Sequence, residues 1–272
     1  MKPYTSRVSE KKRLSVNDLQ ALKNRGEKIS CLTAYDASFS TVLDKAGIEV
    51  ILVGDSLGMV FQGHATTLPV TMDDMIYHTA CVSRGCNRAL VVADLPFMSY
   101  TSLLAAAENA ARLIQGGGAN MIKLEGARPD VVGFLVGNGV PVCGHLGLLP
   151  QFINCLGGYK VQGRELPDAE RIISDAVSLE KAGAGLLILE CVPASLAQTI
   201  SQQLSIPVIG IGAGIDCDGQ VLVLYDILNI GSGRRPKFSK DFMEGATSIE
   251  EAIHNYHIAV KEARFPTIEH SY

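Results

Sequence analysis

The chain has 272 residues and a mass of 29.0 kDa, and 47% of its residues are hydrophobic against 19% charged, so it can bury a large core and wholesale disorder is excluded. A net charge of −4, no Trp and only 6% aromatic residues supply neither the basic surface nor the stacking rings that nucleic-acid binding uses. We therefore expect no nucleic-acid partner.

The first fourteen residues, MKPYTSRVSEKKRL, carry charges and no apolar segment, so we expect no secretory signal. The longest stretch without Asp, Glu, Lys or Arg covers residues 131–159, but Gly, Pro, Asn, His and Gln interrupt it, which excludes a lipid-facing helix. The seven cysteines are odd in number and form no C-x-x-C pair. This argues against a disulfide framework or structural zinc and predicts a protein of the reducing cytoplasm. Because no segment reads as a lipid-facing helix, we also expect no membrane partner.

Short apolar runs rich in Val, Ile and Leu predict eight strands buried on both faces. These runs are Ile29–Thr33, Val50–Gly54, Ala89–Ala93, Met121–Leu124, Val140–Gly144, Gly185–Leu189, Pro207–Ile211 and Val221–Tyr225. Helical patterns lie between many of them. The expected helices are Ala37–Ala46 ending at Gly47, a helix opened by Thr71 and closed by Gly85, a helix opened by Thr101-Ser102, Pro129–Val136, a helix capped by Asp168 that ends at Gly183, and Ala194–Leu204.

Alternating strands and helices indicate a parallel sheet with right-handed crossovers, and eight such units fit a (β/α)8 TIM barrel. A doubly wound open sheet is the main rival. It is weakened because no G-x-G-x-x-G motif opens a helix after the first strand, and the closest glycine-rich match, 210–214, comes late. We predict one α/β domain over residues 1–272, with an N-terminal helical extension, a helical tail over 247–264 and a frayed end over the last eight residues.

Polar side chains follow the ends of six predicted strands, where the active site of such a barrel lies. In chain order these are Asp36, Asp55, Asp94, Glu125, His145 and Glu190. Buried carboxylates are costly without a cation, a proton or a hydrogen-bond donor. Aspartate also caps helices well, which is the favoured interpretation for Asp36 and an open alternative for Asp55 and Asp94 taken singly. Glutamate caps poorly, so Glu125 and Glu190 favour a functional role.

The alternation of a strand places Lys123 on the same face as Glu125, one layer below it. A lysine inside an apolar strand suggests an anionic ligand. Asp55, Asp94 and Glu125 come from neighbouring strands, and three hard oxygen donors suit Mg²⁺ better than zinc.

Three further residues near the predicted strand ends have open or weaker roles. Glu190 lies across the mouth and is free to act as a general base. His145 either contacts substrate or is a hydrogen-bonded structural residue. Cys143 is a poor candidate nucleophile because no base obviously pairs with it.

At these residues the sequence resembles the ketopantoate hydroxymethyltransferase (3-methyl-2-oxobutanoate hydroxymethyltransferase) family. Any one motif is weak, but the ordered set, from about residue 13 to residue 262, is specific. The matching stretches are residues 33–36, 53–58, 93–97, 123–126, 144–148, 189–193, 209–214, 218–223 and 236–238. The chain departs from the family pattern after Gly231, where it reads Ser-Gly-Arg-Arg-Pro, and the C-terminal segment is less typical. The resemblance therefore defines the loops on the folate side and the contacts between subunits less well than the keto-acid site.

The resemblance implies transfer of a hydroxymethyl group from 5,10-methylenetetrahydrofolate to 3-methyl-2-oxobutanoate, which gives 2-dehydropantoate for pantothenate and coenzyme A biosynthesis. It implies a Mg²⁺ site at Asp55, Asp94 and Glu125 that stabilises an enolate of the keto acid. It further implies keto-acid contacts from Asp55, Ser56, Asp94 and Lys123, and Glu190 as the proton acceptor. His145 remains a possible substrate or folate contact. The implied partners are the two small-molecule substrates and further copies of the chain, commonly in a homodecamer.

Two alternatives stay open at this point. The first is a folate-independent, Mg²⁺-dependent C–C lyase of the isocitrate-lyase type. Its signature pairs lysines with Cys-Gly-His, whereas here Pro141 and Val142 precede Cys143. The second is a barrel-shaped assembly protein without activity, which leaves Lys123 and four carboxylates at strand ends unexplained.

Overall fold

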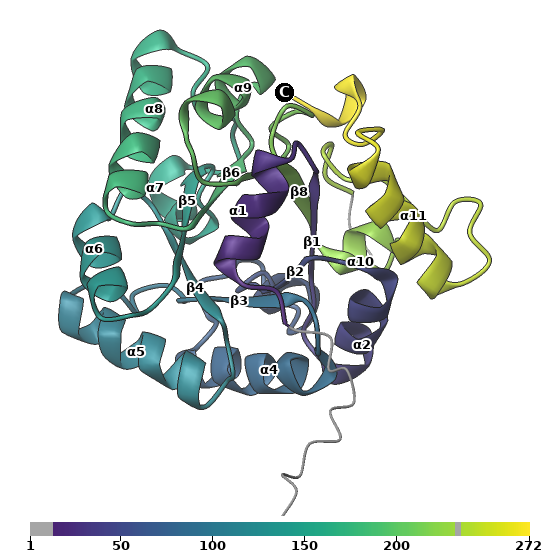
Figure 1. Cartoon of the computed structure of the whole chain (residues 1–272), viewed down its shortest axis with the longest axis horizontal. Helices are drawn as coiled ribbons and strands as arrows, with labels where there is room; N and C mark the ends of the chain where they lie inside the picture. The colour runs from purple at the N-terminus through teal and green to yellow at the C-terminus, as the bar shows by residue number, and fades with distance from the viewer. Residues whose placement is uncertain (1–12, 232–234) are drawn as a thin grey trace, which may run out of the picture.

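A computed structural model describes residues 13–231 and 235–272, so most of the charged N-terminal segment and residues 232–234, where the sequence departs from the family pattern, lie outside the described part. Eight parallel strands close into a barrel in chain order (Figure 1). They are β1 (Ile29–Thr33), β2 (Val50–Val53), β3 (Leu90–Asp94), β4 (Met121–Glu125), β5 (Val142–Gly147), β6 (Leu186–Glu190), β7 (Val208–Ile211) and β8 (Gly219–Leu222). The closed ring confirms the (β/α)8 barrel and excludes the open sheet.

The last strand lies earlier than the sequence pattern predicts. Residues Val221–Tyr225 were expected, but β8 begins at Gly219, and Leu224 opens the short helix α10 (Leu224–Ile227). A Cβ at Gly219 would lie 2.2 Å from the carbonyl oxygen of Ile29, so the pairing of β8 with β1 needs a residue without a side chain. A pattern of apolar residues therefore does not predict that a strand begins at this glycine.

The remaining helices lie around the barrel and over its two ends (Figure 1). They are α1 (Val16–Asn24), α2 (Ala37–Ala46), α3 (Leu57–Val60), α4 (Met72–Gly85), α5 (Leu103–Gln115), α6 (Pro129–Gly137), η1 (Pro150–Phe152), α7 (Ile153–Leu156), α8 (Leu166–Lys181), α9 (Ala194–Gln203), α11 (Ile249–Lys261) and η2 (Ile268–His270). The side chains of Asp36, Thr71 and Ser102 cap α2, α4 and α5, as the sequence predicts. Asp168 is a correction: α8 begins before it, and its carboxylate accepts a hydrogen bond from the backbone N–H of Gly163.

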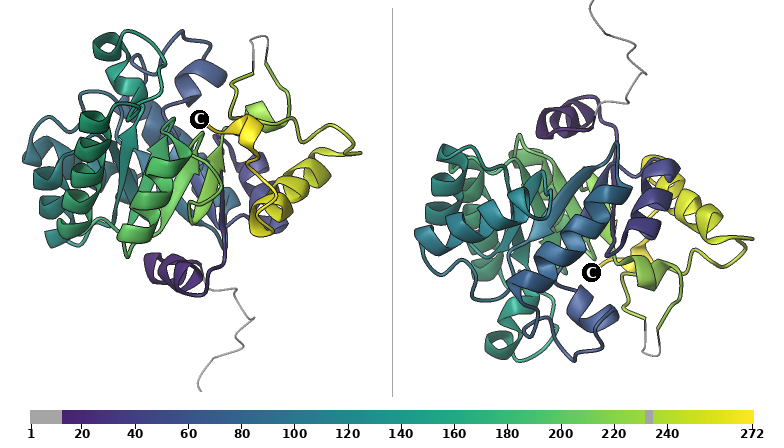
Figure 2. Two further views of the ribbon diagram at one scale, coloured as in Figure 1. Left: turned by 90° about the horizontal axis from the view of Figure 1, so that it is seen from above. Right: turned by 90° about the horizontal axis from the view of Figure 1, so that it is seen from below.

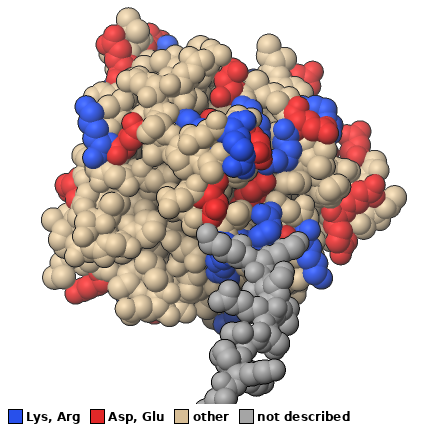
Figure 3. Space-filling model, viewed as in Figure 1, with Lys and Arg blue, Asp and Glu red and all other residues tan. Residues whose placement is uncertain are grey.

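The two ends of the barrel are closed differently. Helix α1 covers one end, and the loops with α3 and α7 cover the opposite end (Figure 2). Lys23 of α1 holds this cover through an ion pair with Asp218, with 2.8 Å between Nζ and Oδ2. Around α1, basic and acidic side chains are interspersed on the surface (Figure 3). Because the strand ends that carry the candidate residues face away from α1, the site lies at the loop end.

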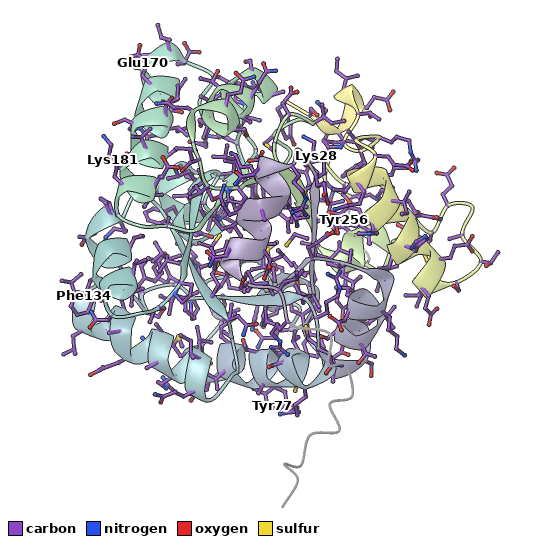
Figure 4. All side chains as sticks on the ribbon, viewed as in Figure 1. Lys28, Tyr77, Phe134, Glu170, Lys181 and Tyr256 are labelled. Atoms are coloured by element: carbon purple, nitrogen blue, oxygen red, sulfur yellow. The ribbon has the colours of Figure 1, made fainter. Side chains whose placement is uncertain are left out.

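Helix α11 packs against α2 and β1. Tyr256 points from it toward the strands (Figure 4), and its hydroxyl lies 2.9 Å from the carbonyl oxygens of both Cys31 and Gln220. The chain end beyond α11 was expected to fray, but Phe265 is buried and the carbonyl of Tyr272 accepts a hydrogen bond from the N–H of Ala194 at 2.9 Å. The prediction of a frayed end is therefore wrong.

No helix within residues 13–231 and 235–272 combines the length and the hydropathy that a membrane crossing needs.

Candidate active site

Three acidic side chains meet at the loop end of β2, β3 and β4. Asp94 and Glu125 are the last residues of their strands, and Asp55 follows β2 by two residues. All three are 1–3% exposed. The backbone N–H of Asp55 donates to Oδ2 of Asp94 at 3.1 Å, so these two carboxylates are neighbours. Burial, and next the charges of Asp94 and Glu125, raise the pKa of Asp55 well above its ordinary value.

Lys123 neutralises part of this charge. The strand register sets it beside Asp94, and its Nζ lies 2.9 Å from Asp94 Oδ1 in a fully buried ion pair. Burial alone lowers the pKa of Lys123, but the neighbouring carboxylates, Asp94 first, outweigh it and raise the pKa above its ordinary value. Lys123 is therefore a permanent cation in the floor of the site.

Gln151, from η1 after β5, connects the acids to one another. Its side-chain amide donates to Asp55 Oδ2 at 2.8 Å and to the carbonyl of Leu95 at 2.9 Å. Its Oε1 accepts from the hydroxyl of Tyr100 at 2.7 Å, and its backbone N–H donates to Glu125 Oε2 at 3.0 Å. Because both of its amide protons and its oxygen are used, the amide has one orientation, and that orientation holds Asp55 in place.

His145 lies between two carboxylates. The register of β4 and β5 sets it beside Glu125, and its Nδ1 is 3.5 Å from Glu125 Oε1, while Nε2 is 3.3 Å from Glu190 Oε2. These distances exceed the usual 2.9 Å or so of a hydrogen bond, so they are close charge contacts. Burial and Lys123 lower the pKa of His145, but Glu125 and Glu190 outweigh them and raise it to about 9. The two carboxylates therefore favour the protonated imidazole.

Ser56 faces the same cavity from the start of α3, without capping that helix. Its Oγ lies 2.9 Å from the hydroxyl of the buried Tyr35. A serine held in this way keeps a polar group available to a ligand.

One cavity of about 500 Å³ lies at the loop end of the barrel. Asp55, Ser56, Asp94, Lys123, Glu125, His145 and Glu190 all line it. The structure thus brings together every site residue that the sequence singled out. Cys143, by contrast, is fully buried, and burial raises the pKa of its thiol to about 12, so it is not a reactive nucleophile.

Three of the acids that line the cavity are candidates to hold a cation. Among residues 13–231 and 235–272, no three His, Cys, Asp or Glu side chains converge closely enough to form a ready-made metal cluster. The chemistry still suits Mg²⁺, because the donors are carboxylates and the buried Glu125 Oε1 has no hydrogen-bond partner. The residues that would hold such a cation are the carboxylates of Asp55, Asp94 and Glu125.

Strand-end reasoning missed three residues: Asp226 lines the cavity, Gln151 donates a hydrogen bond to Asp55, and Tyr100 donates one to Gln151. Gln151 and Tyr100 are uncharged loop residues, and nothing in their spacing marks them. Asp226 directly follows the expected strand Val221–Tyr225, so the rule of polar residues at strand ends could have found it.

Comparison with known proteins gives a consistent result. Residues 13–268 match the model of the family described as ketopantoate hydroxymethyltransferase. The 3-methyl-2-oxobutanoate hydroxymethyltransferase of Thiobacillus denitrificans is 56% identical over 261 residues, covering 95% of this chain and 99% of the relative. The protein of the same name from Alkalilimnicola ehrlichii is 56% identical over 272 residues, covering 99% and 98%.

Solved structures of similar fold are more distant. Phosphonopyruvate hydrolase in complex with oxalate and Mg++ aligns with a TM-score of 0.59 at 10% identity, covering 93% of this chain and 99% of that one. A 2,3-dimethylmalate lyase of the PEP mutase/isocitrate lyase superfamily gives a TM-score of 0.56 at 16% identity, covering 76% and 80%. At these identities the likeness shows the shared barrel alone.

Proposed function

Since this chain belongs to the ketopantoate hydroxymethyltransferase family, we propose that it transfers a hydroxymethyl group from 5,10-methylenetetrahydrofolate to 3-methyl-2-oxobutanoate, giving 2-dehydropantoate for pantothenate and coenzyme A biosynthesis. The observation that carries the proposal is the match to relatives of that name along almost the whole chain. The C3–H bond of the keto acid breaks, a C3–C bond to the one-carbon unit forms, and water supplies the hydroxyl oxygen as tetrahydrofolate leaves.

The floor of the cavity suits the keto-acid end of this reaction. Lys123 places a fixed positive charge near the carboxylate and 2-oxo oxygens of the substrate, and Ser56 offers them a hydrogen bond. Mg²⁺ held by Asp55, Asp94 and Glu125 would supply a Lewis acid that makes the C3 proton more acidic. Gln151 keeps the carboxylate of Asp55 oriented toward that position.

Glu190 is the group best placed to remove the C3 proton. It stands at the end of β6, across the barrel mouth from Asp55 and Asp94, and its carboxylate opens on the cavity. His145 Nε2 lies 3.3 Å from Oε2 of this carboxylate and so helps to position it. Proton transfer by a positioned carboxylate contributes a factor of about 10² to 10⁴ to the rate.

The test is exchange of the C3 proton for deuterium in 3-methyl-2-oxobutanoate, followed by NMR in D₂O with and without Mg²⁺ and without folate. We expect Mg²⁺-dependent exchange that slows by about 10² or more in Glu190→Gln, with keto-acid affinity little changed. Glu170→Gln, an exposed carboxylate on α8 (Figure 4), is the matched control. Wild-type exchange in Glu190→Gln would remove the base assignment. Absence of exchange in the wild type, even after tetrahydrofolate is added, would favour the lyase alternative.

The homodecamer and the cytoplasmic location remain predictions from the family resemblance.

A further inference from the structure

The cavity is larger than the keto-acid site requires. It extends across the barrel mouth to the ends of β7 and β8, which lie opposite β3 and β4 in the closed ring. Its wall there is formed by Val223, Asp226, Phe238 and Tyr272, which we call the β8 lobe. A Cβ at Gly212 would lie 3.1 Å from both Phe238 and Tyr272, so these two rings close tightly over the end of β7. None of the lobe residues has a role in the keto-acid chemistry.

Asp226 is the one acid of the β8 lobe, and it lacks a partner. Within residues 13–231 and 235–272, no group donates a hydrogen bond to its carboxylate or forms an ion pair with it. Arg235 is the nearest compensating charge, but it is bound to Asp241 at 3.1 Å and to Asn229 at 2.9 Å. Burial raises the pKa of Asp226 to about 6, and Arg235 offsets this only in part. The carboxylate is half-buried rather than sealed from solvent, so it is free to accept hydrogen bonds from a ligand that enters the cavity.

Asp226 also lies within electrostatic reach of the keto-acid end. Burial first, and the charge of Asp226 among lesser causes, raise the pKa of Tyr35, whose hydroxyl contacts Ser56 at 2.9 Å. A ligand bound at Asp226 would therefore lie beside the substrate rather than at a separate site.

The chemistry of the lobe selects a flat heterocycle with two adjacent N–H donors. A carboxylate can accept two parallel hydrogen bonds from such an edge, and charge-assisted pairs of this kind are the strong ones. The 2-amino-4-oxo pteridine ring of tetrahydrofolate has this edge, formed by N3–H and the 2-amino group. A cavity of about 500 Å³ falls within the usual range of roughly 300–1,000 Å³ for sites that enclose drug-sized molecules.

The rim of the lobe suits the other end of such a ligand. Lys160 and Lys237 border the cavity, and Lys237 is exposed, with its Nζ 4.8 Å from the ring centre of Tyr272. Folates carry a carboxylate tail, and exposed lysines at a cavity rim attract such groups.

We infer that Asp226 binds the pteridine edge of the folate co-substrate and that the β8 lobe is the folate-side half of the active site. This inference rests on the proposed function. It assigns no proton transfer to Asp226: the residue binds and orients the one-carbon donor opposite the keto acid.

The test compares tetrahydrofolate binding by calorimetry in the wild type, Asp226→Asn and the control Asp216→Asn, an exposed acid outside the cavity. We expect the Kd to rise at least about tenfold in Asp226→Asn, as for loss of a charged hydrogen-bond pair, and to stay unchanged in the control. A tetrahydrofolate analogue without the 2-amino group should bind the wild type more weakly, yet Asp226→Asn should not discriminate between the two ligands.

The possible outcomes separate the two proposals. Equal tetrahydrofolate affinity in the wild type and Asp226→Asn would overturn the inference and leave the proposed function standing. If Asp226→Asn does not fold, undiminished affinity of the wild type for the analogue would overturn it as well. A wild type that binds no tetrahydrofolate in the presence of keto acid and Mg²⁺ would overturn both.

Discussion

Replacing Lys123 by Met tests whether the acids in the barrel floor share charge with a cation site. The substitution keeps a long apolar side chain and removes the ammonium that lies 2.9 Å from Asp94 Oδ1. Asp94 then remains buried next to Asp55 and Glu125, whose charges oppose its own. The variant should therefore be much less stable than the wild type in the absence of divalent ions.

The size of this effect follows from the burial of the pair. Removing one partner of a buried ion pair costs about 3–5 kcal/mol. An unfolding entropy of about 2.1 cal/mol/K per residue over 272 residues gives about 0.57 kcal/mol/K. The melting temperature should accordingly fall by about 5–9 °C.

Calorimetry in EDTA and in saturating MgCl₂ measures the effect and its rescue. A cation bound between Asp55 and Asp94 would replace the lost positive charge, and a ligand at a hundred times its Kd adds about 2.7 kcal/mol of stability. Because no ammonium competes for these carboxylates in Lys123→Met, Mg²⁺ should bind this variant more tightly than the wild type and so reduce the difference between their melting temperatures.

Lys23→Met is the matched control. Lys23 also forms an ion pair with an aspartate, Asp218, at 2.8 Å, but this pair lies at the opposite end of the barrel. Its loss should lower the melting temperature by an amount that Mg²⁺ does not change. If the deficit of Lys123→Met is equally insensitive to Mg²⁺, the carboxylates around Lys123 do not form a cation site and the reasoning is refuted.

Two further predictions concern stability. Gln151→Leu removes the hydrogen-bond partner of both Asp55 and the Tyr100 hydroxyl, so it should lower the free energy of unfolding in urea by about 2–4 kcal/mol. Tyr100→Phe removes only one hydrogen bond and should lower it by about 0.5–1.5 kcal/mol. Equal losses in the two variants would contradict the role of Gln151 as the common partner. Because the pKa of Asp226 is raised from 3.8 to about 6, its burial favours the protonated form, so the wild type loses stability as the pH rises from about 4 through 6. The free energy of unfolding of Asp226→Asn should equal that of the wild type near pH 4 and exceed it at neutral pH by at most about 3 kcal/mol. A difference in stability that does not change with pH would contradict the raised pKa of Asp226.

The barrel could be predicted from the sequence because its strands are buried on both faces and so appear as continuous apolar runs. This held even for short strands such as β2 (Val50–Val53). The same logic misplaced β8, because Gly219 and Gln220 are selected by close packing against β1 and by hydrogen bonding. Asp168 was misassigned because an acid in the first turn of a helix resembles a cap in sequence.

Much of the candidate site could be predicted because parallel strands end at one edge. That rule located Asp94, Glu125 and Glu190 without any knowledge of their contacts. It could not locate Gln151, whose importance comes from four hydrogen bonds to groups far apart in the chain. Side-chain amides carry no charge, so their burial leaves no anomaly in a sequence pattern.

The distribution of charge accounts for the two halves of the cavity. On the β2–β6 side, acids are bound to Lys123, His145 and Gln151, so that half is a preorganised polar site for an oxygen-rich anion and its cation. On the β8 side, Asp226 has no such support and lies among apolar and aromatic groups. A reaction between two unlike substrates needs this asymmetry, because the site that holds the keto acid should not also attract the heterocycle. The unsupported acid is therefore best explained by a ligand that brings its own N–H donors.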